Sequence, residues 1–287
     1  MEKKANSYNS EWDKIPGALA RYPLLMYYAN SKLCPVDQMG FRLIDTQGPF
    51  EFLKNKNISD ITYVCIGGST TFGWFVDYEF SFPAQLEHTL NKRVLNLGIP
   101  GLDIKNCLEI LMQVLRYKTE KIVLIFLFGI NEKSGFIQMN DPKSHSFKTT
   151  HSLFSRLEKE SVKSIFKFPL LIRKNHSNIS NERYSKFLVG QIDETNSYIS
   201  LIRRLCNALD IQSYFILQPH GLKFLHDSNS KFREQYLDDL YSGLKTNLSI
   251  MDISKTCPML ENDFIDWQHP NASGYKKISD SIYRLLK

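Results

Sequence analysis

The segment CIGGSTTFG, residues 65–73, joins an apolar run to two glycines and a serine. An apolar run that ends in Gly67 and Gly68 is typical of a buried strand that leaves its sheet through a tight turn. Ser69 can then be the N-cap of a helix, the more frequent role of a serine there, or a nucleophile held at the strand exit. The choice depends on whether the chain also supplies a base, an orienting acid and an oxyanion site.

Composition and charge are those of an ordinary globular protein. The chain has 287 residues, of which 43% are hydrophobic and 23% charged, and this length permits a sizeable core. A net charge of +6 is too small an excess to indicate nucleic-acid binding, and we expect none. The longest apolar run, residues 122–130, is shorter than the ~20 residues that span a bilayer, so we expect no membrane span.

The first residues and the cysteines bear on location and cofactors. The opening segment MEKKANSYNSEWDK lacks the apolar core of a secretory signal, so we expect a cytoplasmic protein. The five cysteines are scattered and lack paired spacing, which favours reduced thiols and no metal site. No Gly-rich phosphate loop is visible in the sequence, and we expect no cofactor.

Short apolar runs alternate with helical patterns along most of the chain. The runs predict strands buried on both faces, over residues 61–66, 93–98, 121–129, 211–219 and 248–254. Apolar residues at helical spacing predict helices over residues 83–91, 104–117 and 192–209 and around Ile278, Ile282, Leu285 and Leu286. This alternation predicts a parallel sheet with helices on both faces, whose functional site lies at the carboxyl ends of the strands.

Residues able to do chemistry follow four of the predicted strands. Ser69 follows the first strand, Gly98 ends the second, Asn131 follows the third, and the last strand leads into a loop with Asp266 and His269. Each of these residues alone is weak evidence for a functional site, because serine caps, turn glycines and surface histidines are common. Their position at one edge of the same predicted sheet indicates a shared site.

This set of residues is sufficient for acyl transfer through a serine. His269 can take the proton from Ser69, and Asp266, three residues away on a turn that Pro270 keeps from being a helix interior, can orient the imidazole. The backbone N–H groups of Ser69 and Gly98 and the side-chain amide of Asn131 can converge on a developing oxyanion. Gly98 suits this role because it has no Cβ to obstruct the substrate.

These residues, in this order, resemble the SGNH (GDSL-type) hydrolases, a family that includes carbohydrate esterases and O-acyltransferases. The family is named after four residues in separate blocks, and the matching positions here are Ser69, Gly98, Asn131 and His269. The resemblance runs from about residue 61 to the C-terminus. It implies a three-layer α/β/α sandwich around a flavodoxin-like parallel sheet of about five strands.

Two positions depart from the family pattern. The common Gly-Asp-Ser is here Gly67-Gly68-Ser69, which removes an acidic neighbour of the nucleophile and predicts a more flexible turn. The common Gly-x-Asn-Asp here ends in Glu132, which keeps Asn131 and lengthens the carboxylate beside it. Neither departure removes a member of the triad or of the oxyanion site.

Three functions fit this site. The first is a hydrolase that acts through an acyl-serine on O-acylated carbohydrate, so the partner would be a small-molecule or glycan ester. The second is an O-acetyltransferase that passes the acyl group to a sugar or polysaccharide hydroxyl with the same triad. The third is a relative that binds in the same cleft without catalysis.

Two regions lie outside the core of the resemblance. Residues 1–60 predict an N-terminal extension that packs on the hydrolase-like domain of residues 61–287, with Trp12, Tyr27 and Tyr28 as anchors. Residues 133–181 form a basic insertion with nine Lys and Arg against three Asp and Glu, which equals the excess of the whole chain. This insertion either caps the cleft and favours acidic substrates, or is a solvated basic face.

Overall fold

The computed structural model describes residues 36–37, 39–43, 47–54, 61–117, 120–131, 181–224, 228–245 and 249–287, together with the small sheet of β1 (Ala20–Arg21) and β2 (Met26–Tyr27). Residues 133–180 of the expected basic insertion lie outside these ranges, as do Trp12, Tyr28 and Glu132. What the sequence predicts for them stays a prediction.

Five parallel strands form the central sheet in the order β4-β3-β5-β6-β7. They are β3 (Thr62–Gly67), β4 (Val94–Gly98), β5 (Ile122–Phe128), β6 (Gln212–Leu217) and β7 (Ile250–Asp252). Because β3 pairs with β4 on one side and β5 on the other, Gly67 lies opposite both Gly98 and Leu127. The register thus brings the ends of these three strands to one edge of the sheet.

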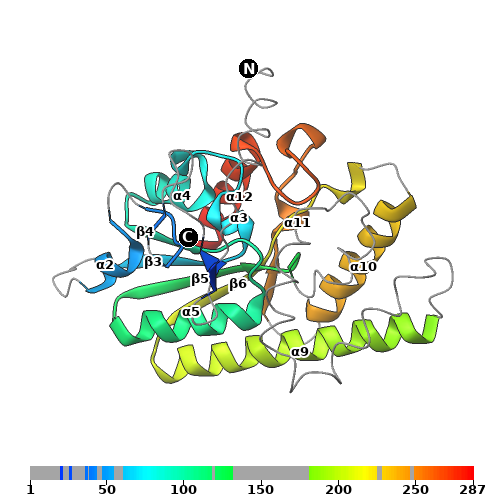
Figure 1. The fold of residues 1–287 in the computed structure, drawn as a ribbon, viewed down its shortest axis with the longest axis horizontal. Coiled ribbons are helices and arrows are strands. Elements are labelled where there is room, and N and C mark those ends of the chain that lie inside the picture. The colour runs from blue at the N-terminus through cyan, green and yellow to red at the C-terminus, as the bar shows by residue number, and fades with distance from the viewer. Residues whose placement is uncertain are drawn as a thin grey trace.

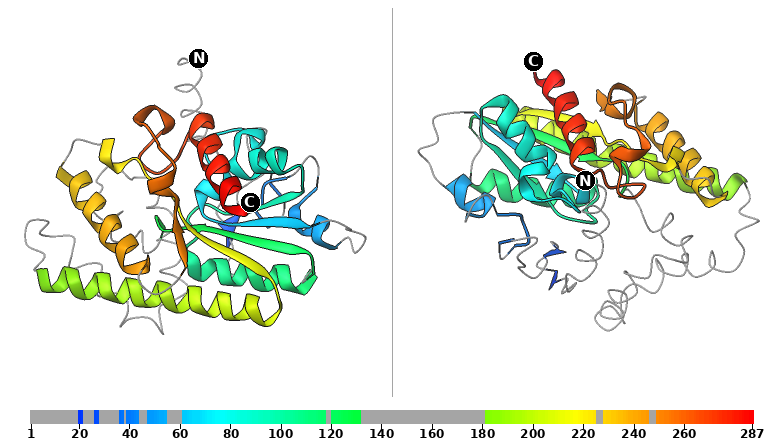
Figure 2. Two further views of the ribbon diagram at one scale, coloured as in Figure 1. Left: turned by 180° about the vertical axis from the view of Figure 1, so that it is seen from behind. Right: turned by 90° about the horizontal axis from the view of Figure 1, so that it is seen from above.

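Helices cover both faces of the sheet, as Figures 1 and 2 show. One face packs with α5 (Ile104–Tyr117), α9 (Asn181–Ala208) and α10 (Ser228–Lys245), and the other packs with α4 (Phe82–Leu90) and α12 (Ala272–Leu286). The predicted α/β/α sandwich around a parallel sheet of five strands is therefore confirmed.

Alternate residues of each strand supply the two cores. In β5, Leu124 and Phe126 belong to the cluster under α5 and α9, whereas Ile125 and Leu127 belong to the cluster under α4 and α12. Every residue of β5 is buried, which explains why the run is apolar throughout instead of alternating with polar residues. This double burial made β5 visible in the sequence as an unbroken apolar run.

The helices differ from the prediction at two places. α9 begins at Asn181, eleven residues before the predicted start at Ile192, and α10 was not predicted. The remaining helical turns are short: α2 (Pro49–Lys54), α3 (Ser69–Phe72), η1 (Tyr78–Phe80), η3 (Leu222–Phe224), α11 (Ile253–Thr256) and η4 (Glu261–Asp263). Among the described residues, no helix has the length and apolar character needed to cross a membrane.

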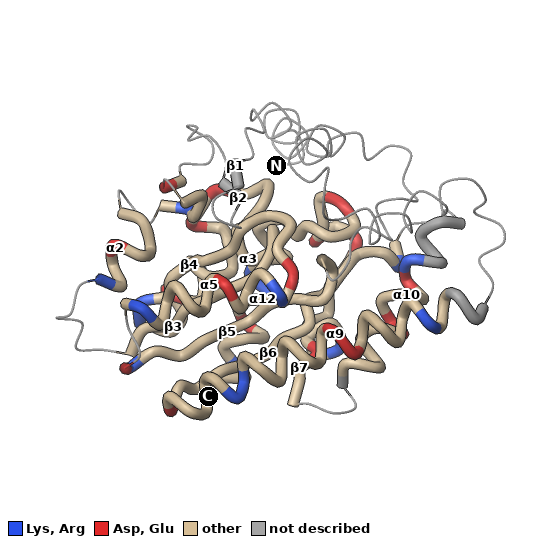
Figure 3. Tube along the Cα trace, turned by 60° about the horizontal axis from the view of Figure 1, so that its bottom comes forward, with Lys and Arg blue, Asp and Glu red and all other residues tan. Residues whose placement is uncertain are grey.

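Part of the N-terminal region lies against this core. Phe41, Phe50 and Leu53 are at most 4% exposed and pack in the same cluster as the residues of α5. Both charge signs lie along α9 and α10, as Figure 3 shows. Basic and acidic residues are thus interspersed along the described parts of these two helices.

Candidate active site

The turn that follows β3 is shaped by close approaches that only glycine permits. A Cβ at Gly67 would overlap the carbonyl oxygen of Leu127 and the hydroxyl of Thr71. A Cβ at Gly68 would overlap the side-chain amide of Asn131. The two glycines thus allow β3 to end directly against its neighbours, and Gly68 is a packing requirement where the sequence suggested added flexibility.

Ser69 is the first residue of α3 and not its N-cap. The N-cap is Gly68, which has no side chain to cap the helix. The Ser69 hydroxyl instead lies 2.8 Å from Nε2 of His269, a residue 200 positions later in the chain. The alternative that Ser69 caps the helix is therefore wrong.

His269 connects Ser69 to Asp266. Its Nδ1 lies 2.7 Å from Oδ2 of Asp266, while its Nε2 faces the serine. The imidazole is almost fully buried, at 5% exposure for the residue, so few waters compete for its two nitrogens. The structure brings together the three residues that the sequence assigned to a triad, in the order that proton transfer from the serine requires.

Asp266 is itself held by the turn on which it lies. Its Oδ1 accepts hydrogen bonds from the backbone N–H groups of Gln268, at 2.9 Å, and His269, at 2.7 Å. Burial raises the pKa of Asp266, but the facing His269 and these hydrogen bonds outweigh it, and the net pKa lies below the ordinary value. Asp266 is thus held as a carboxylate, the form that stabilises an imidazolium.

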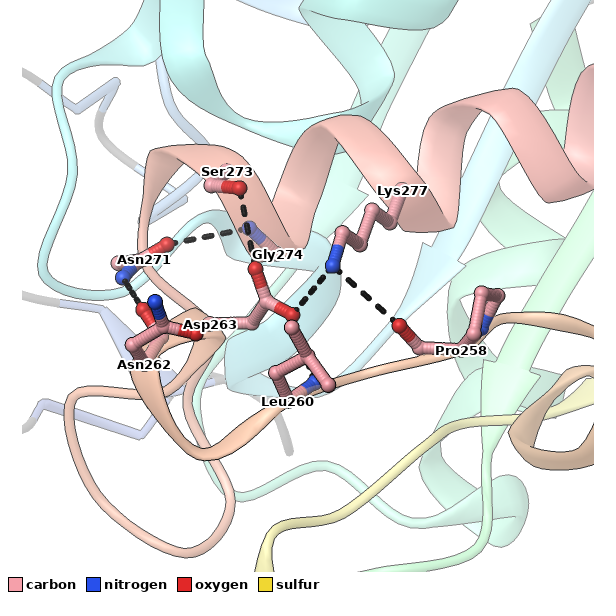
Figure 4. Close-up of polar contacts among 8 residues, drawn as sticks. All are labelled: Pro258, Leu260, Asn262, Asp263, Asn271, Ser273, Gly274 and Lys277. Atoms are coloured by element: carbon pink, nitrogen blue, oxygen red, sulfur yellow. Dashed lines mark hydrogen bonds and ion pairs between the residues drawn. The ribbon is translucent and has the colours of Figure 1, made fainter.

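A polar network anchors the loop that carries Asp266 and His269 (Figure 4). The buried Asp263 carboxylate accepts from Lys277 Nζ at 2.6 Å, from the Leu260 N–H at 2.7 Å and from the Ser273 hydroxyl at 3.0 Å. Asn271 caps α12 by accepting from the Gly274 N–H at 3.1 Å. The loop is therefore fixed to the first turns of α12.

The ring of Phe75 also contacts the His269 imidazole. The two ring centroids are 5.2 Å apart and the planes meet at 84°, an edge-to-face contact. Phe75 has a φ of 69°, in the left-handed region that side chains with a Cβ rarely adopt. Nothing in the sequence singled out Phe75, because an aromatic residue after Gly73-Trp74 has no distinctive pattern.

The backbone N–H of Ser69 and the amide of Asn131 lie near one another. Ser69 opens α3, so its N–H has no acceptor within the helix. Asn131 donates from Nδ2 to the Leu102 carbonyl at 2.9 Å and lies over Gly68, the residue before the nucleophile. One Nδ2 hydrogen is therefore used by Leu102, and the second remains for another acceptor.

The predicted role of Gly98 does not fit the structure. Its N–H donates to the side-chain oxygen of Asn96 at 2.9 Å and the residue is buried. A Cβ at Gly98 would overlap the backbone of Thr71 and Phe72, so this glycine lets α3 pack on β4. We therefore withdraw Gly98 as an oxyanion donor, because its N–H already donates to Asn96 and the residue is buried.

Gly101, three residues later, is a better candidate that the sequence analysis missed. It is exposed, has a φ of 82° and makes no hydrogen bond through its N–H to any residue that the structure describes. Leu102, the next residue, accepts the hydrogen bond of Asn131. The Pro-Gly pair in GIPG was a usable signal, because it marks a turn in which the second residue has positive φ.

Metal ligation has no support in the described part of the chain. There, no group of three or more His, Cys, Asp or Glu side chains is placed to hold a metal ion. Cys65, Cys107, Cys206 and Cys257 are buried free thiols.

No protein-family model and no curated protein sequence matches this chain. Solved structures do match. A lipolytic protein of the G-D-S-L family from Desulfitobacterium hafniense has a TM-score of 0.48 at 15% identity, over 79% of this chain and 100% of that chain. An acetyl xylan esterase has a TM-score of 0.47 at 13% identity, over 79% of this chain and 100% of that chain.

A third similar structure is that of a G-D-S-L lipolytic protein from Veillonella parvula. Its TM-score is 0.43 at 12% identity, over 79% of this chain and 98% of that chain. The solved structures to which this chain is similar thus include lipolytic proteins of the G-D-S-L family, the family that its sequence resembles.

Proposed function

We propose that this protein is a serine-dependent acyl-ester hydrolase that works through an acyl-serine intermediate. The observation that carries the proposal is the continuous chain from Ser69 Oγ through His269 to Asp266, with contacts of 2.8 and 2.7 Å. A serine hydroxyl is a poor nucleophile until a neighbouring base takes its proton. We assign that role to His269, whose Nε2 lies 2.8 Å from the Ser69 hydroxyl.

The first half of the reaction forms the acyl-serine. Ser69 Oγ attacks the acyl carbon while its proton passes to His269 Nε2, and Asp266 stabilises the imidazolium that results. The tetrahedral intermediate then collapses. The bond from the acyl carbon to the alcohol oxygen breaks, and the imidazolium gives its proton to the leaving alcohol.

The second half returns the enzyme to its starting state. A water molecule attacks the acyl-serine as His269 takes one of its protons, and collapse of the second intermediate releases the acid. The same proton then returns to Ser69 Oγ. All proton movements pass through one imidazole nitrogen, which is why its orientation decides the rate.

We assign the oxyanion site to three donors, the backbone N–H groups of Ser69 and Gly101 and the Asn131 side-chain amide. Support comes from two observations. The N–H groups of Ser69 and Gly101 have no acceptor among the residues that the structure describes, and Asn131 is hydrogen-bonded to Leu102, beside Gly101. Donors fixed in advance at the place where negative charge develops lower the barrier without reorganisation. Gly98 has no part in this assignment.

O-acylated carbohydrate is the substrate class that we propose. Support comes from the half-buried rings next to the imidazole: Phe75 contacts His269, and Trp74 lies 5.9 Å from Phe75 between ring centroids. Flat apolar ring faces can pack against the CH groups of a sugar ring. A sugar hydroxyl in place of water would accept the acyl group by the same steps, which makes an O-acetyltransferase the alternative outcome.

The test is turnover of chromogenic acetyl esters and acetylated xylosides by the wild type, with Ser69→Ala as control. Release of acid and transfer to added free sugars are followed together in the same reaction. We expect acid release by the wild type alone. Acyl transfer that exceeds hydrolysis would identify a transferase, and no turnover of any ester at a site that still binds acetylated sugar would contradict catalysis.

A further inference from the structure

Arg42 is a buried cation in the N-terminal region, outside the part of the chain that resembles the hydrolases. It is 1% exposed. Its Nη1 donates to the carbonyl oxygens of Phe72 at 3.3 Å, Gly73 at 3.0 Å and Val76 at 3.0 Å. The guanidinium carbon also lies 5.3 Å from the centre of the Phe72 ring, a cation–π contact.

The three carbonyls belong to the segment that leaves the nucleophile helix. The N–H groups of Gly73 and Trp74 both donate to the Ser69 carbonyl, each at 3.0 Å, so this segment is bonded back to the nucleophile residue. Arg42 therefore joins the last turn of α3 to the residues that follow it. Hydrogen bonds from a charged donor are stronger than neutral ones, and a cation is favourable at the carboxyl end of a helix.

Phe75 lies within the segment that Arg42 holds, between two of the carbonyls that accept from Nη1. Its φ of 69° is costly for a residue with a Cβ, so the surrounding contacts must impose it. The result of this conformation is the edge-to-face contact of the Phe75 ring with the His269 imidazole, at 5.2 Å. Asp266 holds one nitrogen of the imidazole, and Phe75 limits the tilt of the ring.

We propose that Arg42 is a positioning residue of the acyl-transfer site, which holds residues 72–76 so that Phe75 fixes the His269 imidazole opposite Ser69. The inference rests on the proposed function. Through Arg42, the N-terminal region would contribute to catalysis as well as to packing. An apolar side chain could fill the same space but could not donate to the three carbonyl oxygens. Arg42 does not itself contact the reacting groups.

Three variants separate positioning from simple stability. Arg42→Met removes the donors and keeps most of the volume, and Arg42→Lys keeps a charged donor on a different stem. Leu53→Ala is the matched control, because Leu53 is 1% exposed in the same N-terminal region and its side chain belongs to the core cluster under α5. All variants are assayed well below their unfolding temperatures.

We expect Arg42→Met to lower kcat by roughly 10- to 100-fold with KM within a few-fold, as expected when a catalytic group is misplaced by about 1 Å. Arg42→Lys should retain an intermediate kcat. Leu53→Ala should lose stability and keep the wild-type kcat. In this proposal Arg42 and Phe75 both act through the contact between the Phe75 ring and the His269 imidazole. The double variant Arg42→Met/Phe75→Ala should therefore lose no more kcat than the more impaired of the two single variants.

A second readout does not depend on turnover. The ring resonances of His269, assigned by their loss in His269→Gln, should shift or broaden in Arg42→Met and stay unchanged in Leu53→Ala. An unchanged His269 ring or an unchanged kcat in Arg42→Met would overturn the inference, even if the wild type is an active esterase. A wild type without turnover would instead contradict the proposed function, and the resonances would still decide whether Arg42 positions His269. If Arg42→Met does not fold, Arg42→Lys and Phe75→Ala give the same comparison.

Discussion

The turn with Gly67 and Gly68, on the nucleophile side of the proposed site, is shaped by close contacts that leave no room for a Cβ, whereas the loop of residues 263–274, on the base side, is held mainly by side-chain hydrogen bonds. At Gly67 and Gly68 a Cβ would overlap neighbouring groups. Around Asp263 the carboxylate accepts from a lysine, a hydroxyl and a backbone N–H. The first region is therefore sensitive to volume, and the second to charge and pH.

The largest effect short of removing the nucleophile is expected at Asp266. Asp266→Asn keeps an oxygen for the two backbone N–H groups but then presents an amide donor, in place of a carboxylate oxygen, to Nδ1 of His269. We expect kcat to fall on the order of 10³–10⁴-fold, because the imidazolium loses its stabilising charge. Steady-state kinetics on an acetyl ester measure this.

The control for that substitution is Asp193→Asn on the exposed face of α9, which should leave kcat unchanged. A kcat within threefold of wild type in Asp266→Asn would show that His269 does not depend on this carboxylate. The effect of charge on kcat, which distinguishes the base side from the nucleophile side, would then be absent.

A smaller effect is expected at Asn131, whose side-chain amide lies over Gly68. Asn131→Ala removes the proposed amide donor and should lower kcat by ~10²-fold or more with KM within a few-fold, because the donor acts mainly on the transition state. Asn207→Ala, on the surface of α9, is the control. A change confined to KM would mean that Asn131 binds substrate and is not part of the oxyanion site.

Gly68→Ala tests the volume sensitivity of the nucleophile side. The added methyl would displace the Asn131 amide without removing it, so we expect a loss in kcat of about tenfold, less than in Asn131→Ala. Gly190→Ala is matched to it, because a Cβ there meets nothing within 4 Å on an exposed helix position. Equal kcat values in the two glycine variants would contradict the steric account.

The smallest effect is expected in the pH dependence of stability at Asp263. Burial raises the pKa of this carboxyl, but the hydrogen bonds from Lys277, Leu260 and Ser273 outweigh it, and the net pKa is lowered. A lowered native pKa gives stability that is present above the unfolded value of about 3.9 and is lost as pH falls through the native pKa.

Asp263→Asn should therefore be less stable than wild type at pH 7, by about 2 kcal/mol, and the difference should shrink as pH falls below about 4. Thermal unfolding from pH 7 to 3 measures this difference. A gap between the two melting temperatures that stays constant over that range would show that the carboxylate charge does not hold the loop.

The sequence predicted the central strands and the contact between Asp266 and His269 because both depend on patterns that are local in the chain. β5 is apolar throughout because all of its residues are buried, and Asp266 and His269 share one turn. The sequence pattern did not predict α10, whose segment mixes serines, a glycine and charged residues. Local pattern is weak there because burial of that helix depends on the tertiary packing of a few residues such as Leu237 and Leu240.

The oxyanion site was only partly predictable for a different reason. Spacing identified the loop after β4, but it could not show that the N–H of Gly98 donates to Asn96 and that Gly101 is the exposed glycine. The direction of a backbone N–H depends on φ and ψ, which the residue type alone does not determine. In the same way, no local pattern links Arg42 to carbonyls about 30 residues later.

The measurement that tests the central claim most directly is covalent labelling with a serine-reactive phosphonate, followed by peptide mass mapping. We expect one phosphonyl group per chain, on Ser69, with no label in Ser69→Ala and much slower labelling in His269→Gln. Labelling of a different residue in the wild type, or wild-type ester turnover by Ser69→Ala, would contradict the claim that Ser69 is the nucleophile.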